Sequence, residues 1–130
     1  MALFTYLVED NRTIRDNLIP ALQELADAEV VGFAETEIEA VRWLASHGVG
    51  DWELLIVDLF LREGSGLGVL RGCRQRAGQQ YAVVLSNFIN ADIRARCMAL
   101  GADAVFDKSR DLDNFFEYCT GVVHRRPAPQ

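Results

Sequence analysis

Five short apolar segments alternate with stretches of helical periodicity along almost the whole chain. The apolar segments are residues 4–8, 30–34, 54–57, 82–85 and 104–106. Several contain almost no polar residue, which is typical of parallel strands that helices cover on both faces. The alternation therefore predicts an α/β fold, in which a doubly wound five-stranded parallel sheet lies between two layers of helices.

Apolar residues at helical spacing predict the five helices. The first four sets are Ile14, Leu18, Leu22 and Leu25; Ile38, Val41, Leu44 and Ala45; the stretch 66–75; and Ile93, Cys97 and Leu100. The fifth set is the clearest stripe: Leu112, Phe115, Phe116, Cys119, Val122 and Val123. Pro20 is expected to kink or break the first helix, because an interior proline costs about 3 kcal/mol. Gly68 and Gly72 weaken the third.

Composition excludes several classes of function. A chain of 130 residues suits one domain, and a net charge of -6 with a pI of about 4.8 disfavours binding to nucleic acid or an anionic membrane. We find no signal peptide and no apolar run near the roughly 18 residues of a membrane span, so we expect a cytoplasmic protein. Cys73, Cys97 and Cys119 are odd in number and widely spaced, which favours free thiols over a disulfide or metal site.

The predicted topology also predicts where a functional site would lie. At five strands the usual order is 2-1-3-4-5, the flavodoxin-like arrangement, and ligands bind at the carboxyl ends of the strands beside the switch point. The residues at these ends are Glu9 and Asp10, Asp58, Ser86 and Asn87, and Asp107 to Ser109. We therefore expect three carboxylates, a hydroxyl and the Lys108 ammonium to meet in one crevice.

Three neighbouring carboxylates repel one another, by about 4 kcal/mol per pair at 4 Å and an effective dielectric near 20, so they require a cation. Oxygen ligands without nearby His or Cys suit Mg²⁺, or Mn²⁺, rather than zinc. With a lysine and a hydroxyl to bind phosphate oxygens, the set predicts a phosphoryl site with a carboxylate nucleophile. Taken singly, Asp10 and Asp58 could be helix caps, Lys108 a solvated lysine and Ser86 a loop hydroxyl.

Four motifs in this order resemble the receiver domain of two-component response regulators. They are LVEDN at 7–11, IVDLFLREGSG at 56–66, VVLSN at 83–87 and GADAVFDKS at 101–109. The resemblance covers roughly residues 4–123, and we expect a receiver domain over 1–124 with a flexible tail over 125–130. No output domain is expected in the chain, which could be a stand-alone regulator, a phosphate relay or part of a longer protein.

The resemblance implies a role for each residue at the strand ends. Asp58 is expected to accept a phosphoryl group from a histidine kinase or a histidine phosphotransfer protein. The expected Mg²⁺ ligands are Glu9, Asp10, Asp58 and the backbone carbonyl of Phe60. The expected phosphate-binding and switch residues are Ser86, Asn87 and Lys108. Such a domain is a signalling switch rather than an enzyme, and its own chemistry is limited to self-phosphorylation and self-dephosphorylation.

One departure from the family pattern concerns the output. Val105 occupies the position, three residues before Lys108, that usually carries an aromatic switch residue. A downstream target is still expected on the face formed by the fourth helix, the fifth strand and the fifth helix, and a homodimer is possible. The alternative function is a phosphorylation-independent interaction or dimerisation module that retains the acidic pocket. Nucleotide binding is disfavoured because GSGLG at 64–68 matches no dinucleotide or Walker motif.

Overall fold

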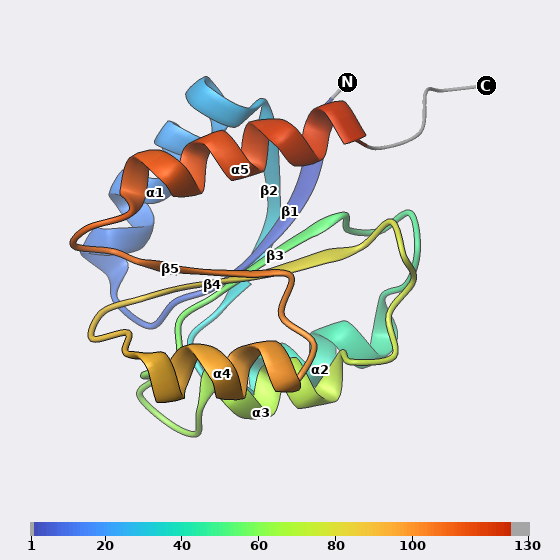
Figure 1. The fold of residues 1–130 in the computed structure, drawn as a ribbon. Coiled ribbons are helices and arrows are strands. Elements are labelled where there is room, and N and C mark those ends of the chain that lie inside the picture. Colours follow the sequence, from blue (N-terminus) through green and yellow to red (C-terminus); the bar gives the residue numbers. More distant parts are fainter. Residues whose placement is uncertain (1, 126–130) are drawn as a thin grey trace.

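The computed structural model describes residues 2–125, with the side chains of residues 2–122, and it has the predicted three-layer architecture (Figure 1). The strands are β1 (Leu3–Val8), β2 (Ala28–Ala34), β3 (Leu54–Val57), β4 (Tyr81–Ser86) and β5 (Ala104–Asp107). The helices are α1 (Arg12–Ala26), α2 (Glu37–Ser46), α3 (Gly66–Gly72), α4 (Ala91–Ala99) and α5 (Leu112–Arg125). All strand pairs are parallel and the order is β2-β1-β3-β4-β5, which confirms the predicted topology.

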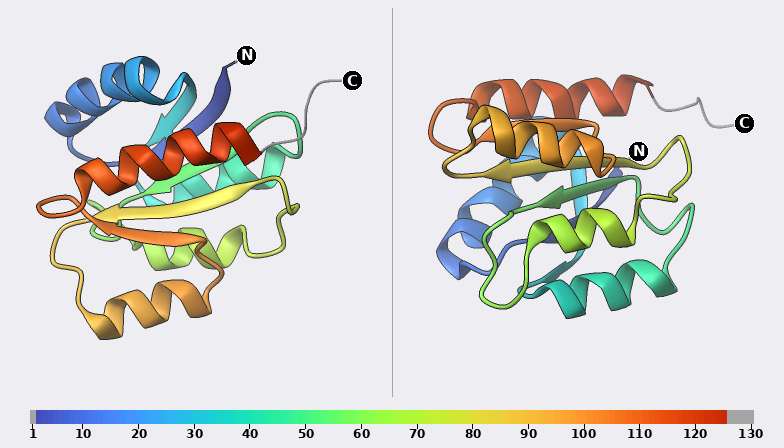
Figure 2. Two further views of the ribbon diagram at one scale, coloured as in Figure 1. Left: turned by 45° about the horizontal axis from the view of Figure 1, so that its top comes forward. Right: turned by 60° about the horizontal axis from the view of Figure 1, so that its bottom comes forward.

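The sheet separates two hydrophobic cores. Helices α1 and α5 cover one face and α2, α3 and α4 cover the other, as Figures 1 and 2 show. The first core contains Leu7, Leu22 and Phe115, and the second contains Val57, Leu70 and Cys97, all fully buried. β3 is buried at every position, because it lies in the middle of the sheet and is covered on both sides.

The prediction of a kink or a break at Pro20 is wrong as to the break, because α1 continues as one helix from Arg12 to Ala26, and the kink stays a prediction. Pro20 and Asp16, whose carbonyl loses its helical partner, both lie on the exposed side of α1. Water can hydrogen-bond that carbonyl, so the proline is tolerated without ending the helix.

The buried stripes of α1 and α2 differ from the predicted ones. In α1 the buried residues are Arg15, Leu18, Leu22 and Ala26, whereas Leu25 is exposed. In α2 the buried residue is Ala40, and Ile38 is exposed. Each helix packs against β2 and one neighbouring helix, α1 against α5 and α2 against α3, and these contacts decide which of its residues are buried. Helix α3 ends at Gly72, earlier than predicted, as its two weak glycine positions allow.

The remaining sequence predictions concern cysteines, membrane helices and the chain end. Cys73, Cys97 and Cys119 are free and buried, as expected. None of the helices in the described part of the chain has the length and hydrophobicity needed to span a membrane. The predicted tail 125–130 lies outside the described residues apart from Arg125, which ends α5, so the domain boundary at residue 124 stays a prediction.

Candidate functional site

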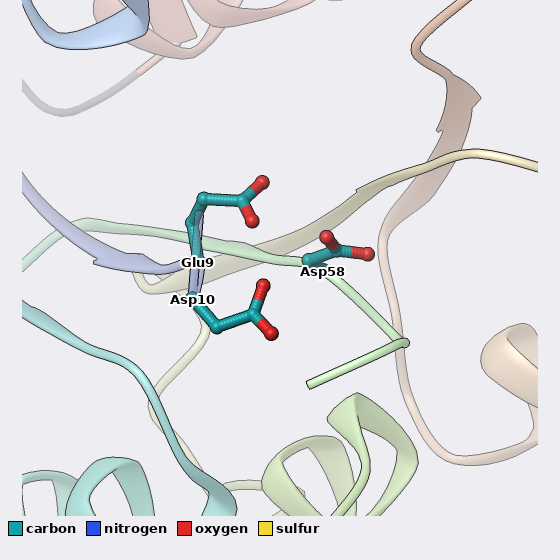
Figure 3. A group of neighbouring side chains, drawn as sticks. All are labelled: Glu9, Asp10 and Asp58. Carbon is teal, nitrogen blue, oxygen red and sulfur yellow. The ribbon is translucent and has the colours of Figure 1, made fainter. Parts of the chain in front are cut away.

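Three carboxylates converge at the carboxyl ends of the two strands beside the switch point. Glu9 and Asp10 follow β1 and Asp58 follows β3, and their side chains lie close together in Figure 3. One carboxylate oxygen of each lies within 4.8 Å of those of the other two. Glu9 is 2% exposed and Asp58 7% exposed, so two of the three negative charges are almost removed from water. Such a cluster requires a positive group among its members.

Lys108 supplies one positive charge to this cluster. Its Nζ donates to Asp58 Oδ2 at 2.9 Å and also to Glu9 Oε1, so one ammonium joins the ends of β1, β3 and β5. Burial by itself lowers the pKa of Lys108, but the two carboxylates outweigh this effect and raise the pKa above the ordinary lysine value. Lys108 is therefore a charged member of the site and not a solvated surface lysine.

Glu9 remains incompletely compensated despite this contact. Burial raises the pKa of Glu9, and the neighbouring Asp58 acts in the same direction, whereas the hydrogen bond from Lys108 opposes them only in part. The net direction is upward. A group in this condition gains from a further positive charge, because a nearby cation favours the ionised form.

The hydrogen bonds of Asp58 are not those of a helix cap. Its Oδ1 accepts from Ser86 Oγ at 2.5 Å and from the Phe60 N–H at 3.3 Å. The next helix begins only at Gly66, and Ser65 caps it. Asp10 is not a cap either, because Asn11 holds that position on α1. The capping alternative therefore fails for both aspartates.

The predicted site residues gather around one pocket of about 330 Å³. It is lined by Glu9, Asp10, Asn11, Ile14, Asp58, Phe60, Asn87, Phe88 and Lys108. Ser86 is fully buried beneath Asp58, and its Oγ also accepts from the Leu59 N–H at 3.4 Å. The structure thus brings together the acidic residues, the hydroxyl and the lysine that the sequence selected.

Val105 lies apart from this pocket. It is buried in the core that faces α4, and Arg94 Nη1 donates to its carbonyl oxygen at 2.7 Å. The aromatic neighbour Phe106 projects to the opposite face, where its ring lies 5.9 Å from Phe115 and 5.7 Å from Tyr118. The aromatic side chain of β5 is therefore packed against α5, on the face of the sheet away from α4.

Sequence reasoning missed two residues at the site, Arg15 and Phe88, and it assigned no role to Asp107, which it did place at the end of β5. Arg15 is a buried arginine whose Nη1 donates to the Glu9 carbonyl oxygen. Phe88 lies on the pocket rim with a positive φ of 60°. Ser109 donates twice to Asp107 Oδ1, from its Oγ at 2.5 Å and from its N–H at 2.8 Å, and these bonds lower the pKa of Asp107. Arg15 had a detectable signal, because it falls in register with Leu18, Leu22 and Ala26.

The donors present at the pocket fit a magnesium ion. Glu9, Asp10 and Asp58 offer carboxylate oxygens, and Phe60 is close enough to line the same pocket. Hard oxygen donors, with room for water molecules, are the ligands that Mg²⁺ prefers. The lining residues contain no His or Cys, so the set does not favour zinc.

A family model describes the same region of the chain. The model of the response regulator receiver domain matches residues 5–120. The chain belongs to the receiver domain family. Receiver domains are signalling domains of two-component systems; they bind Mg²⁺ at an acidic pocket and work with histidine kinases. The predictions of family and of fold are confirmed.

Solved structures agree with this fold. The chain is similar to a LuxR-family two-component response regulator from Aurantimonas sp. SI85-9A1, with 19% identity, 99% and 90% of the two chains covered and a TM-score of 0.82. It is also similar to the response regulator domain of Thermotoga maritima CheB, with 16% identity, coverage of 98% and 100% and a TM-score of 0.79. A third is the phosphorylated cyanobacterial phytochrome response regulator RcpA, with 24% identity, full coverage of both chains and a TM-score of 0.70. No curated protein matches the chain.

Proposed function

We propose that this receiver domain accepts a phosphoryl group on Asp58 from a histidine kinase or a histidine phosphotransfer protein, with Mg²⁺ held by Glu9, Asp10, Asp58 and the Phe60 carbonyl. The observation that carries the proposal is the double contact of Asp58: Ser86 donates to one carboxylate oxygen and Lys108 to the other. The donors that would bind a phosphoryl group are thus already in contact with its acceptor.

The transfer would exchange a P–N bond for an O–P bond. An Asp58 carboxylate oxygen forms a new O–P bond, and the P–N bond of the donor phosphohistidine breaks. The electron pair of that bond returns to the imidazole nitrogen, which takes up a proton. Lys108 and Ser86 then donate to the phosphoryl oxygens, with Asn87 beside them on the pocket wall. Bound Mg²⁺ would supply charge neutralisation at these oxygens.

Hydrolysis of the aspartyl phosphate would return the domain to its starting state and so make it a switch. Water attacks the phosphorus of the acyl phosphate, the O–P bond to Asp58 breaks, and free phosphate leaves with the carboxylate regenerated. No outside substrate is transformed, so we regard the chain as a phospho-acceptor and not as an enzyme. Phosphorylation adds negative charge and acceptor oxygens beside Ser86, which can bias the surrounding loops between two packings.

The output of the switch is proposed on the α4–β5–α5 face. Ser86 ends β4 and pairs with Asp107 of β5, so a shift of its hydroxyl would act directly on β5. With Val105 in the aromatic position and Phe106 packed against α5, the signal would pass through the backbone that Arg94 holds, not through a swinging ring. The bound target is a downstream protein or a second copy of the chain, and the cytoplasmic location remains a prediction.

Acetyl phosphate with Mg²⁺, read by intact mass, tests the proposal. We expect the wild-type chain to gain the mass of one phosphoryl group, and Asp58→Asn to gain none while it keeps its circular dichroism spectrum. Beryllofluoride should bind the wild-type protein but not Asp58→Asn; a similar protein has been solved as a BeF₃-activated receiver domain. A folded wild-type protein that neither gains this mass nor binds beryllofluoride would favour the alternative, a phosphorylation-independent interaction or dimerisation module.

A further inference from the structure

Arg15 is a charged residue in a position that α1 otherwise uses for its core. It is 7% exposed and is followed in the same stripe by Leu18, Leu22 and Ala26. A buried guanidinium is costly unless its charge and its donors are matched. Its partners therefore indicate what the residue does.

Three contacts fix the guanidinium. Its Nη1 donates to the Glu9 carbonyl oxygen at 2.8 Å and to Glu35 Oε2 at 3.2 Å. Its central carbon lies 4.4 Å from the centre of the Phe33 ring, which is cation–π geometry. Because Glu9 follows β1, and Phe33 and Glu35 lie at the end of β2, one side chain of α1 joins the ends of two strands.

The bond to Glu9 acts on the candidate metal ligands. The Glu9 carbonyl belongs to the peptide group that joins Glu9 to Asp10, so fixing it restricts the direction of both side chains. The Glu9 N–H is held as well, by the Ala34 carbonyl at 3.0 Å, and Glu9 Oε2 accepts from the Asn11 N–H at 3.1 Å. We infer that Arg15 is a positioning residue, which orients the Glu9–Asp10 peptide so that the pocket can bind its cation.

This inference rests on the proposed function and makes a distinctive prediction. Arg15 carries a positive charge near a cation pocket, so Coulomb repulsion alone predicts tighter Mg²⁺ binding once the charge is removed. Positioning predicts the opposite, because loss of a group that orients metal ligands typically weakens affinity 10- to 100-fold. The two explanations therefore differ in the sign of the effect.

The test is isothermal titration of Mg²⁺ into wild type, Arg15→Met, Arg15→Lys and Arg12→Met, each checked for folding. Arg12 is the matched control, because it lies one turn earlier on α1 and its side chain is 86% exposed. Its Nε lies 3.7 Å from Oδ2 of the exposed Asp16. Arg12→Met thus removes the same charge from the same helix without touching Glu9. Lysine keeps the charge but cannot reproduce the planar contacts to Glu9, Glu35 and Phe33.

We expect Arg15→Met to bind Mg²⁺ roughly 10-fold or more weakly than wild type, Arg12→Met equally or more tightly, and Arg15→Lys in between. Binding by Arg15→Met that equals or exceeds that of Arg12→Met would overturn the positioning role. If Arg15→Met does not fold, Arg15→Lys decides, and unchanged affinity in that variant overturns the role. A wild-type protein without Mg²⁺ affinity would instead contradict the proposed function itself.

Discussion

Two loops border Asp58, the proposed phospho-acceptor, and they are held by different numbers and kinds of contacts. The β3–α3 loop (residues 58–65) and the β4–α4 loop (residues 87–90) each bring a phenylalanine to the pocket rim, Phe60 at 54% and Phe88 at 82% exposure. Because the β3–α3 loop contains glycines, it would be expected to be the less firmly held of the two. In the structure it is the more firmly held.

The β3–α3 loop is fastened to α2 and to itself. Glu37 at the start of α2 accepts from the Ser65 N–H through Oε1 at 2.9 Å, and its own N–H donates to the Glu63 carbonyl at 3.1 Å. The Gly66 N–H closes the loop on the Leu59 carbonyl at 3.0 Å. The glycines here serve close approach: a Cβ on Gly66 would lie 2.3 Å from the Asp58 carbonyl oxygen.

The β4–α4 loop has weaker attachments and a strained residue. The Ile89 N–H reaches Asp107 Oδ2 at 3.4 Å, a long hydrogen bond, and Asn90 is engaged in capping α4. Phe88 has a φ of 60°, a left-handed conformation that bulky residues rarely adopt. The β3–α3 side of the pocket is therefore the more firmly held, and we expect the side beyond Ser86 to be the part that changes if Asp58 is phosphorylated.

The largest expected effect is at Gly66. Gly66→Ala should lower the free energy of unfolding by about 3 kcal/mol, since its Cβ meets backbone atoms of Asp58 and Leu59 that cannot move aside. Urea denaturation measures the change. Gly78→Ala is the control, because nothing lies within 4 Å of a Cβ there and its φ is not positive. Equal stability of the two variants would mean that the β3–α3 loop is not held as described.

A double-mutant cycle tests the fastening by Glu37. A Cβ on Gly68 would lie 2.3 Å from the Glu37 carboxyl carbon, so Gly68→Ala must push that carboxylate off Ser65. We expect Gly68→Ala and Glu37→Ala each to cost about 1–2 kcal/mol. In the Glu37→Ala background the same glycine change should stabilise by up to about 1 kcal/mol, because alanine is the better helix former. Additive costs in the cycle would contradict the contact.

The raised pKa of Glu9 predicts a pH dependence. The folded state holds the Glu9 proton to higher pH than the unfolded state, so this contribution to stability is complete below pH 4.5 and is lost as pH rises through the folded-state pKa. With EDTA present, wild type should therefore lose stability relative to Glu9→Gln between pH 4.5 and neutral pH, by about 1.4 kcal/mol per unit of pKa difference. Urea unfolding of both proteins across this pH range checks the sign. A difference in stability between wild type and Glu9→Gln that does not change with pH would contradict the prediction.

The smallest effect concerns the strained side of the pocket. Phe88→Asn should raise the free energy of unfolding by about 0.5–1 kcal/mol, because asparagine tolerates a positive φ and little buried surface is lost. The same change at Phe60, where φ is not positive, should give no gain. A gain at both positions, or at neither, would show that backbone strain does not distinguish the loops.

The sequence predicted those features that depend on regular patterns. Five apolar segments were enough for the topology, and the topology then brought Glu9, Asp58 and Lys108 to one edge of the sheet. The observed strand ends differ from the predicted ones by a few residues at most; for example, β2 begins at Ala28, two residues before its predicted start.

What could not be predicted depends on tertiary contacts. The tolerance of Pro20 required knowing which side of α1 faces water, and the contacts of Arg15 required knowing that the ends of β1 and β2 lie beneath it. The tight fit of Gly68 required the position of Glu37, which is far away in sequence, and that of Gly66 required the path of the backbone at Asp58 and Leu59. The strain at Phe88 is a property of the folded backbone and leaves no trace in the residue pattern.

The most direct measurement is the chemical location of the phosphoryl group. After treatment with acetyl phosphate and Mg²⁺, borohydride reduces an acyl phosphate on aspartate to homoserine, and peptide mass spectrometry finds the altered residue. We expect homoserine at position 58, dependent on Mg²⁺, with Asp10 unchanged. Homoserine at position 10, or a phosphoryl group on a serine or histidine with Asp58 intact, would contradict it.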